Sequence, residues 1–223
     1  MLRARSAVFI AVVLGNTGAG PSLFNAGVPG DRALRARSVA EPILEQTTAA
    51  GGGMRTMSAF EYEDRIRASW YGQIAGTLMG FAFEHRAAAA AVVDTIPDRF
   101  KGIPVDDDWY YEMVAVRAFE RFGIKMTVAQ LGEQWKLNNA GSWGSSEQAR
   151  LLLAKGHSAP NTGHPRYNRL WFSIGPQFSA DVYGMIAPGM PNTAGRIARE
   201  YGHVNGYAEG ADGAVFMAGM VSL

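Results

Sequence analysis

Apolar side chains recur at three- and four-residue steps from about residue 58 onward, which is the pattern of amphipathic α-helices. The longest such pattern runs to about residue 84. Its apolar positions are Phe60, Tyr62, Ile66, Trp70, Ile74, Leu78 and Phe81. Gly72, Gly76 and Gly80 share one face of this predicted helix, so we expect another helix to approach closely along that face.

Recognisable start and stop residues predict further helices. A capping box, in which a Ser or Thr pairs with a Gln three residues later, predicts helix starts at Thr127 and at Ser145, and Pro191 suits a first helical turn. Helix ends are expected at Gly123, Gly156 and Gly202, and a last helix is expected from about Gly213. Because no stretch alternates convincingly in the manner of a strand, the sequence predicts an all-α domain with long functional loops.

The first 55 residues follow a different pattern. Arg3 and Arg5 precede a short apolar run over residues 7–14, and sequence rich in Gly, Pro, Ser and Ala follows. We interpret residues 1–55 as a disordered low-complexity leader or signal-like segment, and residues 56–223 as the all-α domain. The sequence does not fix the localisation: it slightly favours the cytoplasm, and the chain would be secreted if residues 1–20 act as a signal peptide. A later translation start, or a small structured extension, remains open.

Composition and charge exclude several kinds of site and partner. The 223 residues are 48% hydrophobic and 18% charged, which suits a domain with a buried core. The absence of cysteine excludes disulfides, thiolate metal sites and cysteine nucleophiles. Residues 56–223 are slightly acidic, so no nucleic-acid partner is expected. The longest apolar stretch there, residues 68–83, is too short to span a membrane and contains Gln73, so no membrane span is expected.

The strongest candidate chemistry lies at Asp106, Asp107 and Asp108, directly before a predicted helix. Three adjacent carboxylates repel one another, and a cation or a proton relieves that repulsion. Hard oxygen donors without cysteine or clustered histidine select Mg²⁺, Mn²⁺ or Ca²⁺. The alternative is an N-terminal cap with solvated acids that complement the helix dipole, and the spacing by itself favours this alternative.

Other candidates are less specific. Glu84 ends the most apolar stretch and is either a metal ligand or general base, or a solvated residue after a core helix. The four histidines show no ligand spacing, so we expect them in loops or at the surface. Aromatic residues such as Trp109 and Trp143 are expected to pack in the core, with stacking on a sugar or base as the alternative.

Four segments, taken in order along the chain, form a set. They are GQIAGTLMGFAFE at residues 72–84, DDDW at 106–109, IGPQFSADVYGMIAPG at 174–189, and HVNG at 203–206 with GAVFMAGM at 213–220. The set resembles the signature segments of the ADP-ribosylglycohydrolase family, which includes the dinitrogenase reductase-activating glycohydrolase. The resemblance covers the chain from about Glu61 to its end.

The resemblance implies a fold, a cofactor and a reaction. The fold would be all-α, with two Mg²⁺ ions in a cleft and Mn²⁺ as a substitute. The reaction would be hydrolysis of the N- or O-glycosidic bond of an ADP-ribosylated protein or a small ADP-ribose conjugate. The implied metal ligands are Asp106, Asp107 and Asp108, the implied catalytic residues are Glu84 and Asp107, and the implied substrate-binding residues are Trp109, Asp181, His203 and Gly206.

The chain also departs from the family pattern. Trp109 replaces the usual Thr after the aspartates, and Thr77 replaces the usual Asp in the first segment. The family completes its metal site with a later Asp-x-Asp-Thr segment, which does not occur before Leu223, and Asp212 lacks that context. We therefore expect a C-terminally truncated copy. The alternatives are a degenerate, non-catalytic family member that binds ADP-ribose or a related ligand, and a hydrolase of another glycoside or nucleoside.

Overall fold

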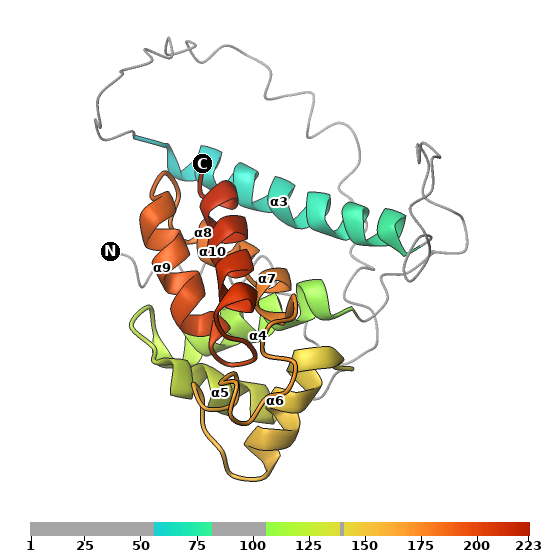
Figure 1. Cartoon of the computed structure of the whole chain (residues 1–223). Coiled ribbons are helices and arrows are strands. Elements are labelled where there is room, and N and C mark those ends of the chain that lie inside the picture. Colours follow the sequence, from blue (N-terminus) through green and yellow to red (C-terminus); the bar gives the residue numbers. More distant parts are fainter. Residues whose placement is uncertain (1–55, 82–105, 139–140) are drawn as a thin grey trace, which may run out of the picture. The chain divides into compact units, whose positions relative to one another are not determined.

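The computed structural model describes residues 56–81, 106–138 and 141–223. From Ser58 onward these residues belong to one unit, which contains helices and no strand in its described part (Figure 1). The helices are α3 (Ala59–Gly80), α4 (Asp107–Phe122), α5 (Val128–Leu137), α6 (Gly144–Ala154), α7 (Gly175–Phe178), α8 (Asp181–Met185), α9 (Pro191–Gly202) and α10 (Glu209–Val221). The prediction of an all-α domain is confirmed for this part of the chain.

Helix α4 supplies much of the core. Tyr111, Val114 and Ala118 on one face of α4 are almost completely buried. Tyr111 stacks on Trp135 of α5, with 4.0 Å between the ring centroids, and α4 also packs against α7 and α8. This face therefore fixes the direction of α4 and the position of its first turn.

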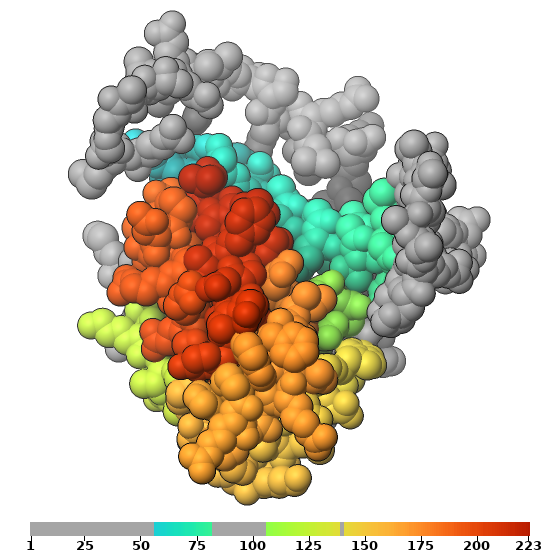
Figure 2. All heavy atoms as spheres, viewed as in Figure 1, coloured from blue at the N-terminus to red at the C-terminus, as the bar shows by residue number. Residues whose placement is uncertain are grey.

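Helices α9 and α10 approach each other closely along their length (Figures 1 and 2). Small residues make this approach possible. The fully buried alanines of the two helices are Ala194, Ala198, Ala211, Ala214 and Ala218. A side chain at Gly195 would lie 2.9 Å from Val215, so this contact has no room for a larger residue.

Several predicted helix ends are confirmed. Thr127 and Gln130 form the expected capping box of α5, and Pro191 is the first residue of α9. Gly123 ends α4 with φ of 80°, a conformation that favours glycine. The described helices include none that could span a membrane.

Two predicted helix starts were wrong. Helix α6 begins at Gly144 with Trp143 at its N-cap position and no side-chain cap, so Ser145 forms no capping box. Ser145 is instead buried against Gly175, which fixes it in the packing between α6 and α7. Helix α10 begins at Glu209 rather than near Gly213, and Gly210 in its first turn packs closely against the carbonyl oxygens of Trp171 and Ser173.

The expected close approach to the glycine stripe of α3 was also wrong for the described residues. A Cβ atom built on Gly72, Gly76 or Gly80 would meet no described atom within 4 Å. The polar contacts of α3 with other elements are made by Tyr62, whose hydroxyl donates to the Met185 carbonyl at 2.8 Å, and by Gln73. The stripe therefore does not mark the face by which α3 contacts the other described helices.

A group of buried polar side chains, here called the polar loop network, joins the loop between α6 and α7 to the chain after α9. It consists of Thr162, Asn168 and Asn205, all almost completely buried. The Asn168 amide donates to the carbonyls of Ser145, Thr162 and Asn205 at 3.0, 2.9 and 3.3 Å. Thr162 donates to the Val204 carbonyl. The network holds a loop that has no regular secondary structure of its own.

Candidate metal centre

The three consecutive aspartates lie at the beginning of α4. Asp106 is the N-cap residue, and its Oδ1 accepts a hydrogen bond from the Asp108 backbone N–H at 3.0 Å. Asp107 and Asp108 are the first two residues of the helix. The predicted cap is thus present, and it holds the Asp106 side chain against the same helical turn that carries the other two carboxylates.

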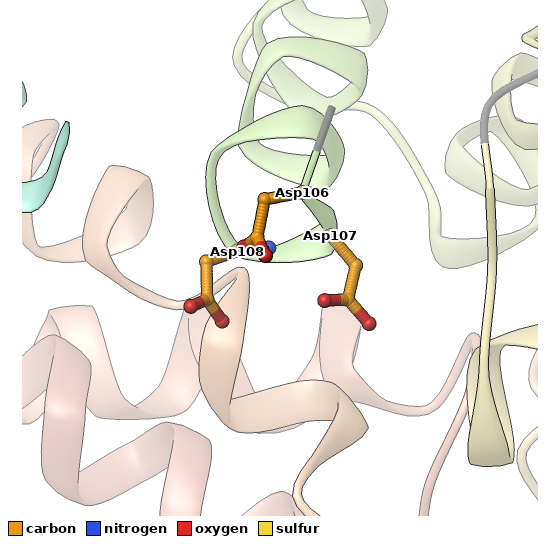
Figure 3. A group of neighbouring side chains, drawn as sticks. All are labelled: Asp106, Asp107 and Asp108. Atoms are coloured by element: carbon orange, nitrogen blue, oxygen red, sulfur yellow. Dashed lines mark hydrogen bonds between the residues drawn. The ribbon is translucent and has the colours of Figure 1, made fainter. Parts of the chain in front are cut away.

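The cap does not disperse the three carboxylates. Each offers an oxygen atom, and these atoms lie within 4.8 Å of one another, on side chains that are partly buried. Figure 3 shows Asp107 and Asp108 extending from the start of the helix in the same general direction. The two oxygens on opposite sides of one cation are separated by about 4.2 Å for Mg²⁺ and about 5 Å for Ca²⁺. The spacing of the triad therefore fits one divalent cation after small side-chain rotations.

Asp181, the first residue of α8, adds a fourth negative charge near the triad. The pKa of Asp108 is raised to about 7, mainly by burial and then by the charges of Asp106, Asp107 and Asp181, together with a hydrogen bond to the Asp106 side chain. Burial also raises the pKa of Asp181 to about 6. At neutral pH the group is therefore only partly ionised, and a cation would compete with protons for it.

Sequence analysis missed Glu112, one helical turn after Asp108. Its side chain is completely buried, and burial raises its pKa well above the usual value, with further contributions from Asp181 and Asp108. One carboxyl oxygen accepts a hydrogen bond from Gln73 at 2.7 Å. The signal in the sequence is an acid on the apolar face of an amphipathic helix, between Tyr111 and Val114, where a buried charge requires a partner.

The remaining predicted site residues fall into separate places. Glu84 lies outside the described residues. Trp109 follows the triad in the first turn of α4, with its ring edge-on to Tyr110. His203 stacks on Tyr207 at 4.4 Å between ring centroids, and the buried Gly206 has no room for a side chain beside Pro176.

The structure thus brings Asp181 close enough to influence the aspartate triad, and it places His203 and Gly206 beside the polar loop network. Gly163 links these two residues to that network, because its backbone packs tightly against both of them. The roles of Trp109, Asp181, His203 and Gly206 in substrate binding stay predictions.

Comparisons of the chain with models of known protein families, with curated proteins and with solved structures found no match. The likeness to the ADP-ribosylglycohydrolase family therefore rests on the four sequence segments. The function is argued below from those segments and from the geometry of the acidic group.

Proposed function

We propose that this chain is a magnesium-dependent hydrolase that cleaves the N- or O-glycosidic bond of ADP-ribosylated substrates. The observation that carries the proposal is the cluster of Asp106, Asp107 and Asp108, whose carboxylate oxygens lie within 4.8 Å of one another at the start of α4. The reaction class comes from the likeness of the four segments to the ADP-ribosylglycohydrolase family.

The donor set suits a hard divalent cation. Within the described ranges this triad is the only group of three or more acidic or histidine residues close enough to share one ion. The chain contains no cysteine, so its ligands are oxygen or imidazole donors. Asp181 and the two helical aspartates also concentrate negative charge that a cation would neutralise.

The side chains of the site have distinct parts in the proposed reaction. The cap to Asp108 N–H fixes one oxygen of Asp106, so this member of the triad is held by the helix backbone and not only by its own rotamer. Asp107 and Asp108 would hold the ion and Asp181 would accept hydrogen bonds from sugar hydroxyls. Mg²⁺, when bound, supplies orientation of the ribose hydroxyls and of a water molecule. Glu84 as general base rests on the resemblance.

An assay for release of ADP-ribose from N-linked and O-linked ADP-ribosylated proteins tests this function. We expect Mg²⁺-dependent release that falls at least 100-fold in Asp107→Ala. Glu209→Gln is the matched control, since Glu209 is an exposed acid in the first turn of α10. Release that survives both chelation of the metal and Asp107→Ala would exclude the proposal.

A second candidate is a non-catalytic protein that binds ADP-ribose or a related ligand. Trp109 favours it, because an indole ring stands where the family has a hydroxyl group that can coordinate or cap. Calorimetric titration with Mg²⁺ and ADP-ribose, run beside the hydrolysis assay, separates the two candidates. Binding without turnover supports the second candidate.

A further inference from the structure

Gln73 of α3 and Glu112 of α4 form a polar contact in which only part of the hydrogen-bonding capacity is used. The Gln73 amide nitrogen donates to Glu112 Oε1 at 2.7 Å. The two remaining oxygens, Gln73 Oε1 and Glu112 Oε2, are both buried and both lack a hydrogen-bond partner. The two unpaired atoms therefore belong to the same two side chains that already share one hydrogen bond.

An ionised Glu112 leaves this contact unsatisfied. A carboxylate oxygen and an amide oxygen are both acceptors, so they cannot pair with each other. A carboxylic acid carries one donor and one acceptor on the same edge, as a primary amide does. One proton on Glu112 Oε2 would therefore turn two unpaired acceptors into a second hydrogen bond.

The surroundings of Glu112 favour a proton over a cation. The charged groups that act on it are Asp108, on its own helix, and Asp181 of α8, and both are acidic. Tyr183 of α8 also faces it, and burial raises the pKa of that phenol, which keeps Tyr183 neutral. In the described segments Glu112 belongs neither to an ion pair nor to a set of acids spaced to share a metal ion.

We propose that Glu112 is a neutral carboxylic acid whose Oε2–H donates to Gln73 Oε1, so that the two side chains form a closed pair of hydrogen bonds that fastens α3 to α4. Glu112 is then a positioning residue, which joins α3 to the helix that carries the aspartate triad one turn away. The pair does not depend on the proposed hydrolase function, because neither of its members is a predicted metal ligand.

Isosteric substitutions test this pair. Glu112→Gln replaces the acid by an amide, which can still donate one hydrogen bond to Gln73 and accept one from it. We expect the folding equilibrium constant of Glu112→Gln to stay within about threefold of that of the parent chain. Glu112→Ala and Gln73→Leu should each lower it at least tenfold, since each leaves a buried partner unpaired. The exchanged pair Gln73→Glu with Glu112→Gln keeps one acid and one amide, so it should be about as stable as the parent chain, and a loss of about tenfold in this double variant would contradict the pair.

Infrared spectroscopy supplies a direct measurement. At pH 8, above the pKa of Asp108 near 7, the full chain should show a carboxylic-acid carbonyl band. The band should vanish in Glu112→Gln and persist in Glu120→Gln, the same change at an exposed position of α4. Absence of the band in the parent chain, its persistence in Glu112→Gln, or destabilisation by Glu112→Gln equal to that by Glu112→Ala would overturn the proposal. If Glu112→Ala does not fold, Glu112→Gln and the band still decide the question.

Discussion

The polar loop network and the acidic site both bury polar side chains, but they satisfy them in opposite ways. In the network, Asn168 donates to three backbone carbonyls and Thr162 donates to a fourth. In the acidic site, the carboxyl groups of the triad and Asp181 lie near one another, and burial together with the charges of the other three raises the pKa of Asp108 to about 7.

This difference distinguishes buried polar groups that stabilise the fold from buried polar groups that are suited to bind a ligand. A network whose donors meet backbone acceptors stabilises one conformation and needs nothing more. In a group of acids that repel one another, ionisation raises the free energy of the folded state. A fold that keeps such a group is therefore less stable than it would be without the group. The acidic site is therefore the region where a bound cation or ligand would stabilise the folded protein by relieving charge repulsion.

The largest effect on stability is expected from the network. Asn168→Ala removes one side chain and leaves the carbonyls of Ser145, Thr162 and Asn205 without this donor. We expect a loss of about 3 kcal/mol in the free energy of unfolding, measured by urea denaturation. Asn161→Ala, at an exposed position of the same loop, should change it by less than about 0.5 kcal/mol. A loss below about 1 kcal/mol in Asn168→Ala would contradict the stabilising role of the network.

A smaller effect is expected from pH on cation binding at the acidic site. Because the pKa of Asp108 is about 7, protons compete with Mg²⁺ below that pH. The affinity should be about tenfold lower at pH 6 than at pH 8, which corresponds to about 1.4 kcal/mol, as measured by calorimetric titration. Asp108→Asn should bind Mg²⁺ weakly and without this dependence. Equal affinity of the parent chain at both pH values would show that Asp108 is not a ligand.

The same residue should lower stability when no cation is bound. Since the pKa of Asp108 is higher in the folded chain than its usual value, the folded state holds a proton that the unfolded state releases. The contribution of Asp108 to stability therefore falls as pH rises from about 4 to about 7. Asp108→Asn should be more stable than the parent chain at pH 8 by about 1 kcal/mol, allowing for solvent screening, and equal to it near pH 4.

Asp64→Asn is the control for this pH dependence, because Asp64 is an exposed acid on α3. Thermal unfolding of both variants in a metal-free buffer measures the difference. If Asp64→Asn gains as much stability as Asp108→Asn at pH 8, the gain reflects net charge and not the burial of Asp108 among other carboxylates.

The smallest effect concerns packing and contrasts α3 with α9. Gly72→Ala places a methyl group where no described atom lies within 4 Å. We expect it to stabilise the chain by about 0.5–1 kcal/mol, because alanine favours a helix over glycine. Gly195→Ala meets Val215 at 2.9 Å and should instead destabilise by about 1 kcal/mol. Destabilisation by Gly72→Ala in thermal unfolding would indicate that the stripe of α3 is a contact surface after all.

Local patterns predicted most of the helices. The capping box at Thr127, the stop at Gly123 and the start at Pro191 all depend on chemistry within one helical turn, and the structure confirms them. The start of α6 was wrong because Ser145 is held by tertiary packing against Gly175, which the sequence spacing of a capping box does not reveal.

The residues of the acidic site, like the helices, were predicted only in part. The aspartate triad is contiguous in sequence, so its clustering followed from adjacency alone. Asp181 was expected only as a substrate-binding residue implied by the family resemblance, and its influence on Asp108, 73 positions earlier in the chain, was not predicted. Glu112 was missed because its importance comes from complete burial and from Gln73, which lies on another helix.

The three hydrogen bonds from the Asn168 amide also affect the order in which parts of the chain fold and unfold. Their acceptors lie 23, 6 and 37 residues away in the chain, so two of them close long segments that only tertiary folding can bring together. The loop between α6 and α7 therefore cannot order before the chain following α9 is in place. In native-state hydrogen exchange, the amides of this loop should lose protection together with those of α9 and α10, as one cooperative unit.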